Sequence, residues 1–114
     1  MGNVIVGKSF EFAVRVVKLA EELKGKQRYE LASQILRSGT SIGANVSEAQ
    51  YSPSKKDFIS KTNIALKEAN ETRYWLRLLR AVEAISEERY LQLRRDIDEI
   101  ISILVAIIKT SKDT

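Results

Sequence analysis

The 114-residue chain contains neither cysteine nor histidine. It therefore cannot supply a disulfide, a thiol nucleophile, a histidine base or a zinc finger, and the usual transition-metal sites are also excluded. Most enzyme mechanisms are removed with them, so we expect a protein that is not an enzyme and that needs no metal and no cofactor. A cysteine-free chain fits a reducing compartment, and we expect a cytoplasmic protein.

Helix breakers and long apolar runs are also scarce, because proline occurs once and glycine five times. The start, MGNVIVGKSF, lacks the basic region and long apolar core of a signal peptide. The longest apolar run, 100–108, is interrupted by Ser102 and is far shorter than the ~20 residues that span a bilayer. We expect no membrane segment and a largely helical chain.

What remains is typical of a folded domain, with 44% hydrophobic and 30% charged residues. This length suits one core, and we expect a single four-helix-bundle domain over residues 1–114. Nineteen basic against fifteen acidic residues give a net charge of +4, which favours anionic partners.

Apolar residues recur at intervals of three and four along most of the chain, which predicts helices. The segment KGKQR (24–28), with a glycine beside basic residues, suits a helix C-terminus and a turn. Near the next turn, either Pro53 takes the first helical position, or Ser54 caps a helix while Asp57 reaches back as in a capping box. Ser86 is the candidate N-cap of the last helix. The first expected helix begins near Val4 or Ser9 and ends at Leu23, and the second begins near Tyr29. The third runs from 55 to 84, and the fourth runs from 87 to 109 before a frayed SKDT tail. Short connections between four helices predict an all-α, antiparallel up-down-up-down bundle.

The segment RSGTSIGANVSEA (37–49) has the composition of a loop but the periodicity of a helix. At about 100° per residue, one face of 29–51 is apolar. Gly39 and Gly43 lie beside that face, where a missing Cβ lets another helix approach closely. A phosphate-binding loop is not indicated, because the required lysine spacing and preceding strand are lacking. The opposite face is a polar stripe, which is either a solvated surface or a subunit contact or ligand groove; it consists of Arg37, Ser41, Asn45 and Glu48.

The third and fourth expected helices carry apolar residues around a wider arc than one bundle core requires. Ile64, Trp75 and Val82 lie on one side of the third helix, and the run 100–108 cannot all face one way. Such helices are expected to bury a second face against another chain, which predicts a homo-oligomer. The alternative is that a compact bundle hides these helices by itself.

A basic ridge is the clearest indication of nucleic-acid binding. Arg73, Arg77 and Arg80 share one helix face, with Lys55 on the same line at the other end of the helix, and the turn adds Lys24, Lys26 and Arg28. Arginine ridges can contact successive phosphates. Glutamates on the same helix leave an ordinary salt-bridged surface as the alternative.

The segments KSFEFAVRVVKLAEEL, RSGTSIGANVSEA and SKKDFISKTNIALKEANETRYWLRLL resemble the bacterial four-helix-bundle family encoded in intervening sequences of 23S ribosomal RNA genes. The family motif falls on Arg37, Ser41-Ile42, Asn45 and Glu48, and then on Phe58, Asn63-Ile64-Ala65 and Glu71. Ala49 stands where many members have glycine, and Lys67-Glu68 stands where a glycine-serine pair is frequent.

The resemblance implies an antiparallel bundle that commonly assembles as a ring of five, without an assigned catalytic activity. Its relatives include accessory proteins of diversity-generating retroelements, which bind nucleic acid and a reverse transcriptase. RNA or DNA binding through the basic surface is therefore the leading hypothesis. The alternative is a protein-interaction scaffold that docks a partner through the polar stripe without binding nucleic acid.

Overall fold

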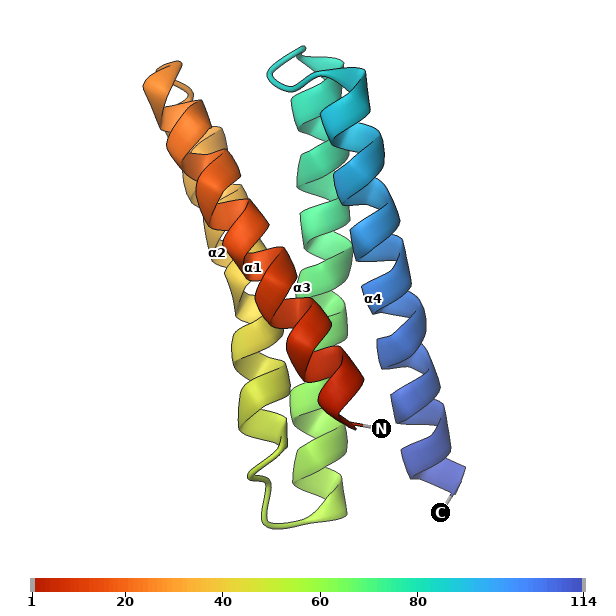
Figure 1. Cartoon of the computed structure of the whole chain (residues 1–114). Coiled ribbons are helices and arrows are strands. Elements are labelled where there is room, and N and C mark those ends of the chain that lie inside the picture. Colours follow the sequence, from red (N-terminus) through yellow and green to blue (C-terminus); the bar gives the residue numbers. More distant parts are fainter. Residues whose placement is uncertain (1, 114) are drawn as a thin grey trace.

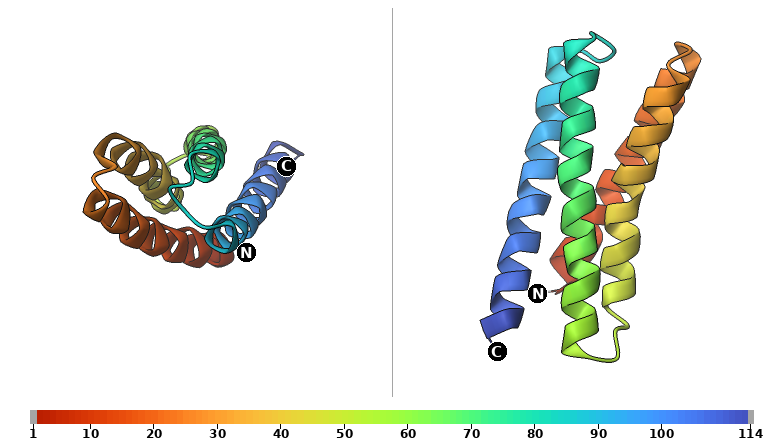
Figure 2. Two further views of the ribbon diagram at one scale, coloured as in Figure 1. Left: turned by 90° about the horizontal axis from the view of Figure 1, so that it is seen from above. Right: turned by 180° about the vertical axis from the view of Figure 1, so that it is seen from behind.

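The computed structural model describes residues 2–113, which form four helices joined by short turns (Figure 1). The helices are α1 (Gly2–Gly25), α2 (Tyr29–Ala49), α3 (Lys55–Ala81) and α4 (Glu87–Asp113). Consecutive helices pack against each other, α1 also packs against α4, and side chains from all four helices meet in one core (Figure 2). This arrangement confirms an all-α, antiparallel up-down-up-down bundle.

The predicted apolar face of 29–51 forms one wall of the core. Ile35 and Ile42 are fully buried, and Val46 and Ala49 are 2% exposed. The opposite walls come from the other three helices, whose fully buried large side chains include Phe12, Leu19, Leu76, Leu79, Ile97 and Leu104. The segment 37–49 is therefore an amphipathic helix, as its periodicity predicts.

The two glycines of α2 lie where α1 crosses it closely. A Cβ on Gly39 would lie 2.8 Å from both Cγ atoms of Val16, and one on Gly43 would lie 3.2 Å from the backbone oxygen of Ser9. Neither position has room for a larger side chain without a shift of α1. The prediction that these glycines permit close helix packing is confirmed.

The helices before the first and third turns, α1 and α3, end at residues other than those predicted. α1 continues through Gly25, and Gln27 instead adopts the left-handed conformation (φ 65°) that ends the helix. α3 ends at Ala81 rather than at Ala84, because Glu83 is also left-handed (φ 58°). Both ends carry the two backbone hydrogen bonds of a Schellman motif. At the end of α1, Gln27 N donates to Lys24 O and Arg28 N donates to Leu23 O. At the end of α3, Glu83 N donates to Arg80 O and Ala84 N donates to Leu79 O.

The N-terminal caps of α3 and α4 are the predicted serines. Ser54 Oγ accepts a hydrogen bond from Asp57 N (3.1 Å), so Pro53 lies outside the helix. Ser86 Oγ likewise accepts from Arg89 N (3.1 Å). These bonds satisfy backbone donors that a helix start leaves without partners.

The predicted frayed tail is wrong for the residues described, because α4 is helical to Asp113. Lys112 lies in the last turn, where a cation suits the negative end of the helix dipole, and Ser111 is half-buried. Thr114 lies outside the described residues. Among residues 2–113, none of the helices is long and apolar enough to cross a membrane.

Candidate nucleic-acid interface

The predicted basic residues of the first turn lie at the same end of the bundle as the α3–α4 turn (Figure 1). Lys26 Nζ donates a hydrogen bond to Ala84 O at 3.4 Å and so joins the two turns. Lys24 and Arg28 are exposed. None of these three cations takes part in an ion pair within residues 2–113.

The arginine ridge on α3 approaches this end, and its three members differ in their contacts. Arg73 donates to Asp98 Oδ1 of α4 (3.1 Å) and to Asn70 Oδ1 (3.0 Å), so a carboxylate already compensates its charge. Arg77 is exposed and Arg80 half-exposed, and the described part of the chain provides neither with an ion pair. The basic end is therefore defined as Lys24, Lys26, Arg28, Arg77 and Arg80.

A second arginine shares the carboxylate that holds Arg73. Arg94 Nε donates to both oxygens of Asp98, at 3.1 and 3.0 Å, and its NH1 donates to Tyr90 Oη at 2.9 Å. The hydrogen bonds to Asp98 and to Tyr90 raise the pKa of Arg94. This guanidinium stays charged at every physiological pH, and it is held on the α3–α4 surface.

Lys55 does not join the basic end. It opens α3 at the opposite end of the bundle, about 33 Å from Arg77 at 1.5 Å per residue. Lys55 and the arginines lie on one helix, as predicted from the sequence. A nucleic acid could contact both Lys55 and Arg77 only by spanning most of the length of α3.

The polar stripe of α2 lies partly in solvent and partly against α3, since the Arg37 and Glu48 side chains are 51% and 58% exposed. Arg37 is paired with Glu71 and, through NH1, with Glu68 Oε1 at 3.2 Å. Glu71 Oε2 also accepts from Trp75 Nε1 at 2.9 Å. Glu68 gives Arg37 a second carboxylate.

The remaining stripe residues also find partners within the bundle. Glu48 accepts from Lys61 Nζ of α3 at 2.8 Å, and Asn45 Nδ2 donates to the backbone oxygen of Ser41 at 2.9 Å and to its Oγ at 3.2 Å. Phe58, from the same motif, is half-buried and lines an apolar pocket at the Lys55 end. Arg37 and Glu48 thus pair with α3 at a solvated surface, whereas Ser41 and Asn45 bond to each other within α2.

An exposed apolar surface lies on α1, which the sequence-based prediction of self-association did not include. Phe10, Val14 and Val17 are 68%, 39% and 40% exposed and follow one line at i, i+4 and i+7. In the 100–108 run, Ile100, Leu104 and Ile108 are buried, Ile101, Ile103 and Ile107 are half-buried, and Val105 is 48% exposed. The sequence contains an indication of this surface, because the apolar residues of α1 occupy two adjacent rows and one row suffices to face the core.

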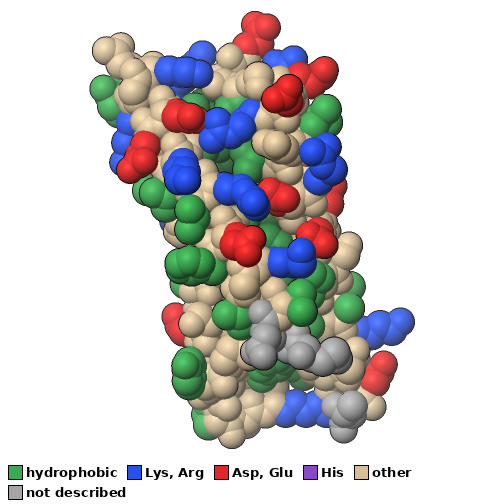
Figure 3. Space-filling model, in the orientation of Figure 1, with side chains coloured by type: hydrophobic (Ala, Val, Ile, Leu, Met, Phe, Trp, Pro, Cys, Tyr) green, Lys and Arg blue, Asp and Glu red, His purple; other side chains and the backbone are tan. Residues whose placement is uncertain are grey.

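The surface over α1 and α4 is different in character, with acidic and basic side chains interspersed (Figure 3). Three ion pairs cross this seam, from Lys8 to Glu99 (3.0 Å), Arg15 to Asp96 (3.2 Å) and Arg89 to Glu22 (2.7 Å). The α1 members recur every seven residues, so they share one helix face. Residues 2–113 contain no cluster of three or more acidic side chains able to hold a metal ion.

Comparisons with known proteins agree with this architecture. No curated protein matches the chain. The chain is similar to a crystal structure of a protein with unknown function from the S23 ribosomal protein family of Bacteroides thetaiotaomicron, with 53% identity, a TM-score of 0.92, and coverage of 95% of this chain and 97% of that one. The family model described as "23S rRNA-intervening sequence protein" matches residues 2–106. The chain therefore belongs to the 23S rRNA-intervening sequence protein family.

Proposed function

We propose that this chain is a non-enzymatic, homo-oligomeric bundle that binds RNA or DNA through its basic end. The observation that carries the proposal is the gathering of five cations, free of ion pairs within residues 2–113, where the two turns meet. Such side chains can replace the counterions of successive phosphates, which supplies most of the affinity of nonspecific nucleic-acid binding. The name of the family, which refers to an intervening sequence of 23S rRNA, supports RNA as the first candidate.

Self-association is the second element of the proposal, and the α1 stripe of Phe10, Val14 and Val17 supports it. Beside the stripe lies a shallow groove of about 550 Å³ whose walls include Gly43 and Ala44 of α2. An exposed aromatic side chain next to a groove of small residues suits contact with another copy, because both surfaces lose apolar area to water on association. Following the resemblance, we propose a ring of five, in which the basic ends are repeated and their fields add.

Salt-titrated binding of the full chain to a structured RNA and to a DNA duplex tests the proposal. Binding is expected to weaken steeply with salt, with a slope of log K against log[salt] of about −0.9 per phosphate neutralised on duplex DNA. The double variant Arg77→Glu/Arg80→Glu is expected to lose at least tenfold in affinity.

The matched control is Lys55→Glu/Lys56→Glu, which makes the same change of charge on two exposed residues at the far end of α3. It is expected to retain most of the affinity. Equal losses in the two variants would show that net charge, not the basic end, governs binding. Absence of binding at low salt would contradict the proposal, and partner capture that survives nuclease treatment would then favour the protein scaffold.

A further inference from the structure

An apolar pocket opens at the end of the bundle opposite the basic end. Its volume is about 450 Å³, and all four helices contribute to its wall. α3 and α4 extend beyond the described start of α1 at this end of the bundle (Figure 1). The pocket is independent of the proposed nucleic-acid surface.

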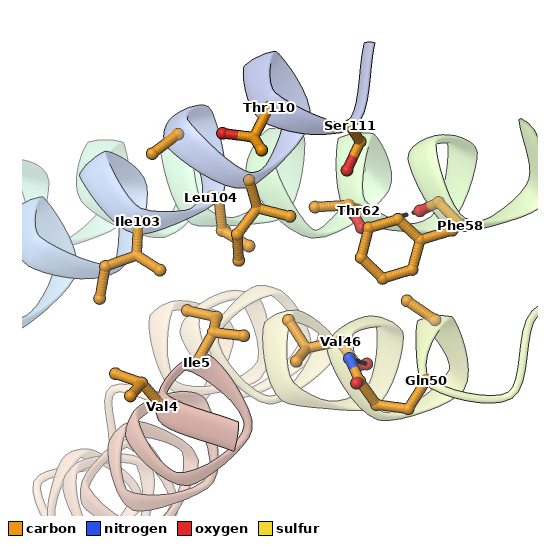
Figure 4. A pocket seen from close by; sticks show the side chains of 13 residues that line it. Val4, Ile5, Val46, Gln50, Phe58, Thr62, Ile103, Leu104, Thr110 and Ser111 are labelled. Carbon is orange, nitrogen blue, oxygen red and sulfur yellow. Dashed lines mark hydrogen bonds between the residues drawn. The ribbon is translucent and has the colours of Figure 1, made fainter. Parts of the chain in front are cut away.

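The pocket has a buried floor and an apolar lining. Ile5, Val46 and Leu104 are at most 2% exposed, and Figure 4 shows Ile5 and Val46 facing Leu104 and Phe58 across the space. Its described lining contains no charged side chain; it consists of Val4, Ile5, Val46, Ala49, Gln50, Phe58, Thr62, Ile103, Leu104, Ala106, Ile107, Thr110 and Ser111. A charged ligand would lose its hydration there without gaining a counterion, so the lining selects uncharged molecules.

Polar groups are few, and they lie where the pocket meets solvent. Gln50 is exposed and donates Nε2 to Val46 O at 3.1 Å, which leaves its side-chain oxygen as an acceptor. Thr110 is exposed on the α4 side. Thr62 Oγ1 already donates to Phe58 O at 2.8 Å, so the interior offers a ligand little hydrogen bonding.

The geometry points to a binding site for an uncharged, mainly apolar small molecule with one hydroxyl or carbonyl group at the solvent-facing rim, beside either Gln50 or Thr110. Ligand sites of roughly 300–1,000 Å³ with apolar walls and a few polar groups are typical, and they occur between the helices of bundles. Apolar cavities of about 150 Å³ already take up benzene, so this pocket has room for about ten or more carbon atoms. A chain alcohol of that length has the required chemistry.

Fluorescence of the uncharged dye N-phenyl-1-naphthylamine on the intact chain tests this site. The dye is expected to bind with 1:1 stoichiometry, and 1-decanol is expected to displace it at concentrations at least tenfold lower than decanoate does. Equal competition by decanoate would overturn the selectivity argument. Lack of saturable dye binding would overturn the site.

Two variants locate the dye in the pocket. Ala106→Trp and Thr110→Trp place bulk into it from exposed lining positions and are expected to weaken dye binding at least tenfold. Val105→Trp adds an indole to the same helix outside the lining and is expected to leave binding unchanged. Circular dichroism establishes that each variant is folded. Full binding by both filled variants, or a dye affinity that follows the oligomeric state of the protein, would assign the dye to another surface and overturn the inference.

Discussion

At the residue scale, the close crossing of α1 and α2 depends on two glycines without a Cβ, and Gly39 has the tighter contact of the two. Gly39 is buried against Val16, a β-branched side chain with little freedom to turn away. The periodicity of 29–51 predicts that Gly39 lies beside the apolar face, but it cannot predict which residue of α1 sits above it. That partner depends on how the two helices cross, which the pattern of one helix does not contain.

Gly39→Ala is expected to destabilise the fold by about 1–2 kcal/mol, because overpacking outweighs the gain in helix propensity. Gly7→Ala is the matched control, since a Cβ there meets nothing within 4 Å, and it is expected to stabilise by about 0.5–1 kcal/mol. Urea denaturation at one fixed protein concentration measures both. A stable Gly39→Ala variant would contradict the close crossing.

The first turn provides a second test at this scale, because its left-handed residue is Gln27 and not the nearby glycine. Gln27→Gly relieves a conformation that glycine adopts freely, and Gly25→Ala removes a glycine from a helical position with open space around it. Each is expected to raise the free energy of unfolding by about 0.5–1 kcal/mol. Glu83→Gly is the equivalent change in the α3–α4 turn, and it is also expected to raise the free energy of unfolding. Thermal unfolding of the three variants measures these changes.

At the element scale, the contacts between neighbouring helices differ in the interactions that stabilise them. α2 and α3 share a buried hydrogen bond from Thr72 Oγ1 to Ser38 Oγ (2.9 Å) and the Arg37–Glu71–Trp75 cluster at the surface. α1 and α4 share the smallest interface of the four adjacent pairs, and exposed ion pairs cross it. Such pairs contribute little individually, so the α1–α4 seam is expected to be the first to open.

The Arg37 cluster can be followed through Trp75, the only tryptophan of the chain. Arg37→Gln and Glu71→Gln are both expected to shift its emission, because each disturbs the carboxylate that accepts from the indole. A double-mutant cycle is expected to give a coupling of about 0.5–1 kcal/mol for this partly exposed pair. Glu48→Gln breaks the separate pair with Lys61 and is expected to leave the emission unchanged; a shift there would mean that the stripe acts as one unit.

At the scale of the whole molecule, the helices and their order could be predicted because spacing, caps and short turns all agree. The candidate site was predictable only in part. Helical spacing places Arg73, Arg77 and Arg80 on one face, but the pairing of Arg73 with Asp98 depends on α4, 25 residues away. In the same way, the stripe from Arg37 to Glu48 is amphipathic by sequence, and only the fold shows that α3 lies against it.

The account depends on copies of the chain associating through α1 so that their basic ends are repeated. Sedimentation velocity tests this claim most directly, together with Phe10→Lys/Val14→Lys and the control Leu91→Lys/Val105→Lys on the exposed face of α4. The account predicts a wild-type species of five times 12.9 kDa, a monomer for the α1 variant and an unchanged oligomer for the control. A wild-type chain that stays monomeric at high concentration, or a control that dissociates while the α1 variant does not, would contradict it.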